Sequence, residues 1–275
     1  MTFSLNEDQN KAVRKTDNIS NELLSNITEK FISPDTFKNF TYSKKNHFDL
    51  FKKFDYDKEL FGYVVDPEDC DLKIYQDLLI FSYLKENLKK GSKILDLGGG
   101  DSRILKYFKN DYECWNIDKL EGVGNGPKEI NSDGFRLVND YMGNFNKELQ
   151  DNYFDLVFSI STLEHAPIDD YAVYENIKND INRVLKPGGY SVHCLDILWK
   201  EAIDMVWTNK ILYYLFENEK MINDFVPFEN LKQDSDLYSM SEKRYEKTWQ
   251  FTTQKPYKIF GRPISYNFIW KKPAD

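Results

Sequence analysis

The fold is decided by the segment KILDLGGGDSRIL, residues 93–105. Its first five residues form a short apolar run that leads directly into three consecutive glycines, and the residues after them suit the start of a helix. Glycine allows positive φ angles and a close approach of the backbone to a ligand. The first turn of a helix offers free N–H groups. We therefore predict a buried strand, a tight turn and a helix that together face a nucleotide-type ligand.

Three kinds of nucleotide loop can be compared with this segment. A Walker loop needs a lysine after its glycines, and none follows here. A dinucleotide fingerprint needs a third glycine where this chain has Arg103. Asp96, just before the glycines, would repel a pyrophosphate but can pair with an amino-acid ammonium group. S-adenosylmethionine carries such a group, together with a sulfonium.

Strand and helix patterns alternate after the glycine loop, which predicts a parallel sheet with right-handed crossovers. Apolar runs predict strands at residues 93–97, 112–117, 135–138, 154–160 and 190–195. Helical spacing predicts helices at residues 70–88, 104–108, 171–185 and 199–221. Two late strands are expected at residues 248–253 and 264–270, with loops over 223–246. The expected fold class is α/β: a doubly wound, mostly parallel, seven-stranded sheet with helices on both faces.

The chain divides into four expected parts. Residues 1–90 would form an N-terminal helical cap, which includes an amphipathic stretch around residues 23–31. Residues 91–198 would form the ligand-binding core, and residues 199–246 an inserted, aromatic cover over the substrate. Residues 247–275 would supply the closing strands.

The segment DLGGGD, residues 96–101, resembles the first motif of class I S-adenosylmethionine-dependent methyltransferases. Residues 154–165 resemble the fourth strand and following loop of the family's small-molecule branch, and residues 183–189 its turn into the fifth strand. Ser102 replaces the last glycine of the family's loop, which puts the detailed geometry of the loop in doubt.

The resemblance implies S-adenosylmethionine as cofactor and S-adenosylhomocysteine as product. It places Asp118 on the ribose hydroxyls and Asp140 on the adenine amine. The full set of cofactor-binding residues expected from it is Asp96, Gly98, Gly99, Gly100, Asp118, Asp140, Tyr141 and Ser161.

Two residues are candidates for the base that takes a proton from the methyl acceptor. His165 follows the fourth strand and Asp196 ends the fifth, so both would lie at the carboxyl edge of the sheet, where open α/β folds bind ligands. The alternative for His165 is that it only shapes the loop beside the cofactor. Glu164 is expected to be structural, and His193 to be a core histidine with satisfied hydrogen bonds.

Composition limits the classes of partner. A net charge of −8 argues against a nucleic-acid partner, because phosphate backbones require basic surfaces. The three cysteines form no CxxC pair, so no metal site is expected. Neither a leader segment nor a membrane span is expected, which favours a cytoplasmic protein.

The function expected from the sequence is methyl transfer to a small metabolite, at oxygen in preference to nitrogen. A building block of a surface carbohydrate or a specialised metabolite would be such an acceptor. Two alternatives stay open: an NAD-dependent or nucleotide-sugar enzyme on a similar sheet, and a non-catalytic partner subunit that keeps the fold. The sequence does not specify an oligomeric state.

Overall fold

The computed structural model describes residues 40–63, 65–122 and 126–274. The amphipathic stretch expected around residues 23–31 lies outside them. The described residues contain a seven-stranded sheet in the order β3-β2-β1-β4-β5-β6, with β7 paired to β5. Its strands are β1 (Lys93–Leu97), β2 (Glu113–Ile117), β3 (Arg136–Val138), β4 (Phe154–Ile160), β5 (Leu185–Lys200), β6 (Met205–Trp207) and β7 (Arg262–Lys271).

The pairing confirms the doubly wound, mostly parallel sheet. The four pairs formed among β1 to β5 are parallel, whereas β6 and β7 are antiparallel to β5. The chain order reverses between β1 and β4, and the carboxyl ends of these two strands are where such a sheet binds its ligand.

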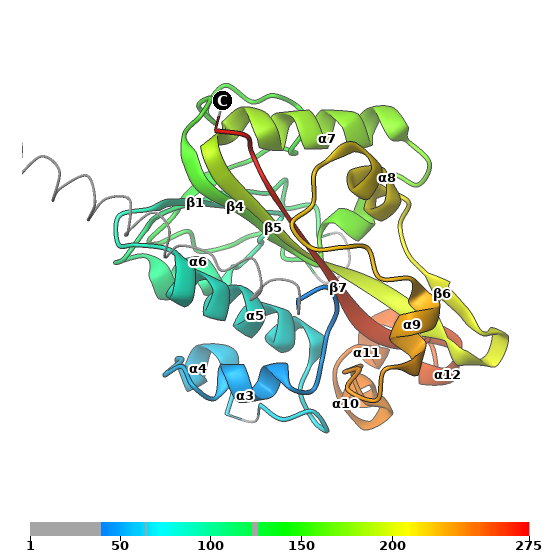
Figure 1. The fold of residues 1–275 in the computed structure, drawn as a ribbon. Helices are drawn as coiled ribbons and strands as arrows, with labels where there is room; N and C mark the ends of the chain where they lie inside the picture. Colours follow the sequence, from blue (N-terminus) through cyan, green and yellow to red (C-terminus); the bar gives the residue numbers. More distant parts are fainter. Residues whose placement is uncertain (1–39, 64, 123–125, 275) are drawn as a thin grey trace, which may run out of the picture.

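Helices cover both faces of the sheet (Figure 1). On one face lie α5 (Leu72–Asn87) and α6 (Arg103–Phe108), whose apolar side chains form one core with those of the strands. On the other face lie α7 (Tyr171–Val184) and α8 (Ile211–Asn218), which pack in a second core. Two short helices, α3 (His47–Phe51) and α4 (Lys58–Phe61), lie on the outside of α5. The fold is therefore a sheet between two layers of helices.

Helix α5 is buried on nearly all sides. Asp71 begins the helix by accepting a hydrogen bond from the N–H of Lys73. Residues 75–84 are all buried, because the sheet covers one side of α5 and α3 and α4 cover the other. A polar residue in this buried stretch, such as Gln76, must therefore find its partners within the protein.

The outer edge of β7 is covered by two segments from distant parts of the chain. The N–H of Ser43 donates to the carbonyl of Ser265 at 2.9 Å, and that of Ile222 donates to the carbonyl of Ile269 at 2.7 Å. These bonds occupy backbone carbonyl groups of β7 that would otherwise be free to pair with another chain.

Three sequence-based predictions after β5 were wrong. Residues 248–253 form no strand: α11 (Gln250–Thr253) lies there, and the N–H of Thr253 bonds to the carbonyl of Trp249. Residues 223–246 are not all loop, because they hold α9 (Phe228–Gln233) and α10 (Glu242–Lys247), and α12 (Tyr257–Phe260) follows. The helix expected from residue 199 begins only at Ile211, after the end of β5, the short helix η2 (Glu201–Ile203) and β6.

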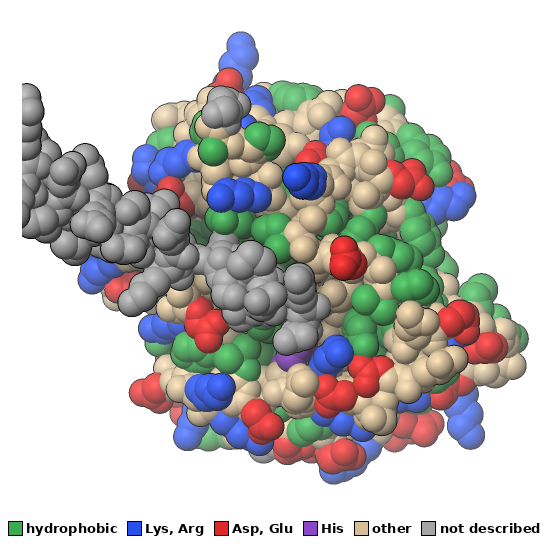
Figure 2. All heavy atoms as spheres, in the orientation of Figure 1, with side chains coloured by type: hydrophobic (Ala, Val, Ile, Leu, Met, Phe, Trp, Pro, Cys, Tyr) green, Lys and Arg blue, Asp and Glu red, His purple; other side chains and the backbone are tan. Residues whose placement is uncertain are grey.

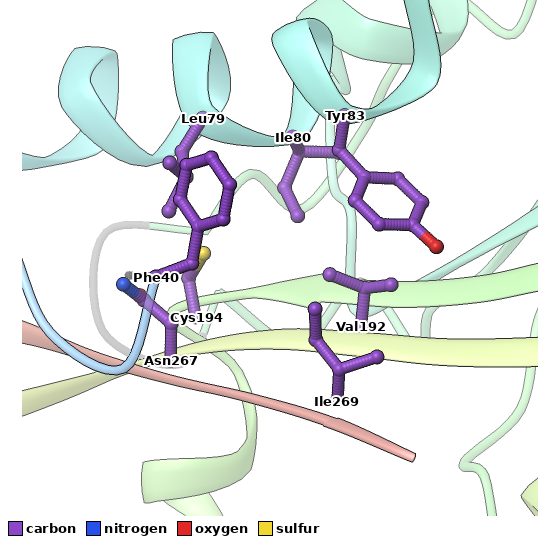
Figure 3. A pocket seen from close by; sticks show the side chains of 8 residues that line it. All are labelled: Phe40, Leu79, Ile80, Tyr83, Val192, Cys194, Asn267 and Ile269. Atoms are coloured by element: carbon purple, nitrogen blue, oxygen red, sulfur yellow. The ribbon is translucent and has the colours of Figure 1, made fainter. Parts of the chain in front are cut away.

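A small hollow lies between α5 and the strands β5 and β7 (Figure 3). Its volume is about 10 Å³, room for one water at most. Its lining is apolar apart from Asn267 and the hydroxyl of Tyr83. It is too small to hold a metabolite.

The N-terminal cap of α7, the helix packed on the second face of the sheet, can be tested by mutation. Asp170 caps α7 by accepting from the N–H of Val173 at 3.1 Å. We expect Asp170→Ala to lower the free energy of unfolding by about 1 kcal/mol in urea denaturation, since the cap is lost. Asp170→Asn should keep most of the stability, and an equal loss in both variants would contradict a capping role.

Candidate active site

The glycine loop after β1 is shaped by close contacts that leave no room for side chains. Gly98 and Gly100 have φ angles of 62° and 51°, in the left-handed region. A Cβ on Gly98 would lie 2.3 Å from Cγ2 of Thr162, and one on Gly99 would lie 2.3 Å from Oδ2 of Asp96. The loop thus presses against the end of β1 on one side and the loop after β4 on the other.

Two side chains at the end of β2 fasten the glycine loop. Asn116 accepts from the N–H of Gly99 at 3.2 Å and donates to the carbonyl of Gly100 at 2.9 Å. Asp118 accepts from the N–H of Gly100 at 2.8 Å and from that of Leu120 at 2.6 Å. Asn116 was missed by sequence reasoning, although a polar residue in an otherwise apolar strand was a usable signal.

Asp96 lies buried beneath the loop and keeps one oxygen without a partner. Its side chain is 2% exposed, and Oδ1 accepts no hydrogen bond from any described residue. Burial raises the pKa of this carboxyl group well above its usual value, while Ser102 and Lys73 oppose the shift. A buried carboxyl group with a free oxygen is suited to receive a cationic donor, because the donor would repay the cost of burying the charge.

Asp140 and Tyr141 lie beyond the end of β3. Asp140 accepts from the amides of Asn144 at 2.6 Å and Asn146 at 2.8 Å. Burial alone would raise the pKa of Asp140, but these two hydrogen bonds and one from the N–H of Tyr141 lower it overall. The hydroxyl of Tyr141 bonds to Glu121, and its ring is 48% exposed. Tyr141 thus lies on the protein surface.

The loop after β4 brings the remaining predicted residues to the same edge. Ser161 takes a positive φ of 48°, which turns the chain sharply at the end of the strand. Thr162 then donates from Oγ1 toward the carbonyl of Gly98 at 3.3 Å, so the two loops are joined directly. The short helix η1 (Leu163–His165) follows and carries Glu164 and His165.

Ser161 and Asp196 belong to a polar network centred on Gln76 of α5. The amide of Gln76 donates to Oδ1 of Asp196 at 2.7 Å and to Oγ of Ser265 at 3.1 Å. The hydroxyl of Ser161 lies within 2.8 Å of both Oδ1 of Asp196 and Oε1 of Gln76. Gln76 was missed by sequence reasoning. Its signal was its polarity on an apolar helix.

His165 is an exposed residue. The protein packed around its ring lowers the pKa of His165, while the nearby Asp196 carboxylate opposes that shift. A lowered pKa keeps the imidazole neutral near pH 7, the form that accepts a proton.

His193 is a core residue, as expected. Its two ring nitrogens bond to the hydroxyls of Ser159 at 2.7 Å and Ser191 at 2.6 Å. Burial lowers its pKa to about 3, so the ring is neutral. It stacks on Trp270 with ring centroids 4.8 Å apart.

The described part of the chain holds neither a cluster of metal ligands nor a membrane-spanning helix. No group of three or more His, Cys, Asp and Glu side chains there is arranged to hold a metal ion. None of its helices is long and apolar enough to cross a membrane. On the described surface drawn in Figure 2, cationic and anionic side chains are interspersed.

Comparison with known proteins finds a family model that matches the centre of the chain. Residues 95–193 match the methyltransferase-domain family. This segment starts within β1, includes the glycine loop and the loop after β4, and ends within β5. No curated protein matches the chain.

Solved structures resemble the chain at low identity. They include phosphoethanolamine N-methyltransferase 2 of Haemonchus contortus in complex with phosphomonomethylethanolamine and S-adenosylhomocysteine, at 15% identity and a TM-score of 0.42. That match covers 88% of this chain, and the chain spans only 60% of the Haemonchus protein. A methyltransferase from Archaeoglobus fulgidus is 18% identical, with a TM-score of 0.43 and coverage of 78% of this chain and 97% of its own. A Burkholderia thailandensis 1,6-didemethyltoxoflavin-N1-methyltransferase is 12% identical, with a TM-score of 0.40 and coverage of 74% and 78%.

The contact between Gly99 and Asp96 can be tested by adding one methyl group. We expect Gly99→Ala to destabilise the protein by roughly 1–3 kcal/mol, because its Cβ would overlap the Asp96 carboxyl group. Asp101→Ala, at a half-exposed neighbour, is the control and should change stability by less than about 0.5 kcal/mol. Equal stability of Gly99→Ala and wild type in urea denaturation would contradict the close packing of the loop.

Proposed function

We propose that residues 95–193, which match the methyltransferase-domain family, form a class I S-adenosylmethionine-dependent methyltransferase domain, and that the chain transfers a methyl group to a small metabolite. We propose oxygen rather than nitrogen as the atom that is methylated. The observation that carries the proposal is Asp96, a buried carboxyl group with an unpartnered oxygen beneath a glycine loop. That chemistry suits the ammonium group of the cofactor's methionine end.

The residues around the loop fit the rest of the cofactor. S-adenosylmethionine, when bound, supplies an electrophilic methyl group on its sulfonium. Asp96 would hold the ammonium group, and Gly98, Gly99 and Gly100 would let the backbone approach the methionine end. Asp118 would hold the ribose: each of its oxygens accepts one backbone N–H and retains a second lone pair for a hydroxyl.

Asp140, Tyr141 and Ser161 would have more limited roles in cofactor binding, because their side chains already form hydrogen bonds within the protein. Asp140 already accepts hydrogen bonds from Asn144 and Asn146, and its remaining lone pairs would accept one from the adenine amine. Tyr141 would lie beside the adenine ring at the protein surface. Ser161 would act on the cofactor indirectly, since its hydroxyl is engaged with Gln76 and Asp196.

The acceptor side is supported by two groups that can hold a proton. His165, with its lowered pKa, is neutral at physiological pH and would take the proton of an acceptor hydroxyl as oxygen attacks the methyl carbon. Asp196, held by Gln76 and Ser161, would orient the acceptor or share that proton. A hydroxyl nucleophile benefits from such groups, which is why we favour oxygen.

The rival functions are less well supported. An NAD-dependent enzyme would place a pyrophosphate at the glycine loop, where the Asp96 carboxyl group would repel it. A non-catalytic subunit would have no need for a buried, unpartnered carboxyl group, which lowers stability. We also propose the cytoplasm as the compartment, because all three cysteines are buried thiols.

The activity is tested by methyl transfer from radiolabelled S-adenosylmethionine. The purified chain is offered matched hydroxyl and amine compounds, for example methyl glucoside, catechol and ethanolamine. Label in a hydroxyl product supports the proposal, whereas label only in amine products would move the reaction to nitrogen. Absence of transfer to any compound, together with absence of S-adenosylhomocysteine binding, would favour the non-catalytic alternative.

Asp118→Ala should weaken S-adenosylhomocysteine binding by about tenfold or more, which corresponds to about 1.4 kcal/mol. The physical reason is the loss of both ribose acceptors and of the bond to the N–H of Gly100. Isothermal titration calorimetry measures the affinity, with Asp111→Ala as a control outside the site. Unchanged affinity in Asp118→Ala would remove the ribose role.

His165→Ala should lower turnover by roughly 10²–10⁴-fold if His165 takes the acceptor proton. Its affinity for S-adenosylhomocysteine should stay close to that of wild type, because none of the residues proposed for the cofactor depends on the imidazole. Unchanged turnover would leave only the structural role for this residue.

A further inference from the structure

The carboxyl group of Glu164 is buried at the carboxyl edge of the sheet and lacks a hydrogen bond. The residue is 7% exposed, and neither Oε1 nor Oε2 has a hydrogen-bond partner among the described residues. The backbone at Glu164 and at Asp196 lowers the pKa of Glu164, against the larger effect of burial. A buried polar group without partners costs stability, so its presence calls for a role.

The position of Glu164 puts this group beside the proposed reaction site. Thr162, two residues earlier, donates to the carbonyl of Gly98 in the glycine loop. His165 is the next residue in η1. The Asp196 carboxylate lies close enough to raise the pKa of Glu164. Glu164 therefore belongs to a segment that contacts the glycine loop through Thr162 and packs against β5.

Hydrogen bonds from Asn209 hold the backbone at Glu164 in place. Asn209 donates to the carbonyls of Glu164 at 3.0 Å and Ala166 at 2.8 Å. The side-chain oxygen Oδ1 of Asn209 accepts from the hydroxyl of Tyr174 at 2.9 Å. Because the main chain is fixed on both sides, the absence of partners at the carboxyl group is not the result of a loosely placed loop.

Burial and the neighbouring Asp196 favour the protonated form of Glu164. Asp196 repels the charged form, and Lys73 attracts it. Burial is the largest influence and raises the pKa of Glu164 well above its usual value. Lys73 is also engaged with the carbonyl of Ile160 at 3.3 Å, and His165 beside it is neutral. With Glu164 protonated, the Asp196 carboxylate still disfavours a second negative charge at this place.

We propose that Glu164 binds the methyl acceptor, by accepting a hydrogen bond from a hydroxyl or amine group next to the atom that is methylated. This inference rests on the proposed function and narrows its substrate class. The acceptor offers an O–H or N–H group and carries no phosphate or carboxylate at that end. Its hydrogen supplies the partner that the buried carboxyl group lacks in the free protein.

A small apolar carbodiimide tests whether Glu164 is both protonated and reachable. The reagent takes the carboxyl proton on one of its nitrogens, and the carboxylate oxygen bonds to its central carbon, so the adduct is found by peptide mass spectrometry. With the S-adenosylhomocysteine-loaded chain at neutral pH, we expect labelling of Glu164 to exceed that of exposed Glu175 by about tenfold or more. Absence of label on Glu164 would overturn the proposal, because an acceptor could not reach it either.

Thermal unfolding of Glu164→Gln gives a second readout. The folded state of wild type holds the Glu164 proton more tightly than the unfolded chain does. Wild type therefore loses stability as pH rises from about 4.5 through the folded pKa. Glutamine does not titrate, so the melting temperature of Glu164→Gln minus that of wild type should grow with pH. Glu175→Gln is the matched control and should show no such trend. A difference that grows toward low pH would mean an ion-paired, structural Glu164 and would overturn the proposal.

Calorimetry separates this inference from the proposed function. If wild type and Glu164→Gln bind S-adenosylhomocysteine equally and Glu164 is not labelled, the inference fails and the cofactor assignment stands. If neither binds S-adenosylhomocysteine, the proposed function itself fails.

Discussion

The structure of the site depends on one constraint, the burial of the Asp96 carboxyl group at the end of β1. Gly99 must lack a side chain because this carboxyl group lies where its Cβ would point. The loop can then turn back over the strand, and Asn116 and Asp118 fasten it from β2. One oxygen of Asp96 has no partner among the described residues, and we propose that it receives the cofactor's ammonium group.

The polar network around Gln76 connects this cradle to the rest of the fold. It joins α5 on one face of the sheet to the loop after β4, to β5 through Asp196 and to β7 through Ser265. Asp196 is therefore held in place by the core, and its orientation is fixed before any acceptor binds. Positioning of this kind is where much of the rate of a displacement reaction arises, up to roughly 7–11 kcal/mol in favourable cases.

Sequence reasoning succeeded where a segment had a strong pattern of its own. The runs at residues 93–97 and 154–160 are apolar because both faces of those strands are covered, and they were recognised as strands. Residues 248–253 are rich in aromatic and β-branched residues, but α11 (Gln250–Thr253) lies there, and the backbone N–H groups of Thr252, Thr253 and Gln254 bond within the segment 249–254. The roles of Gln76 and Glu164 depend on contacts between distant segments, which no local pattern contains.

The central claim is that the cradle above Asp96 is built for a cationic amino-acid group. The most direct measurement compares calorimetric titrations of the chain with S-adenosylhomocysteine and with NAD⁺. We predict saturable binding of S-adenosylhomocysteine at one site, weakened in Asp96→Asn, and no binding of NAD⁺. Binding of NAD⁺ in preference to S-adenosylhomocysteine would contradict the account.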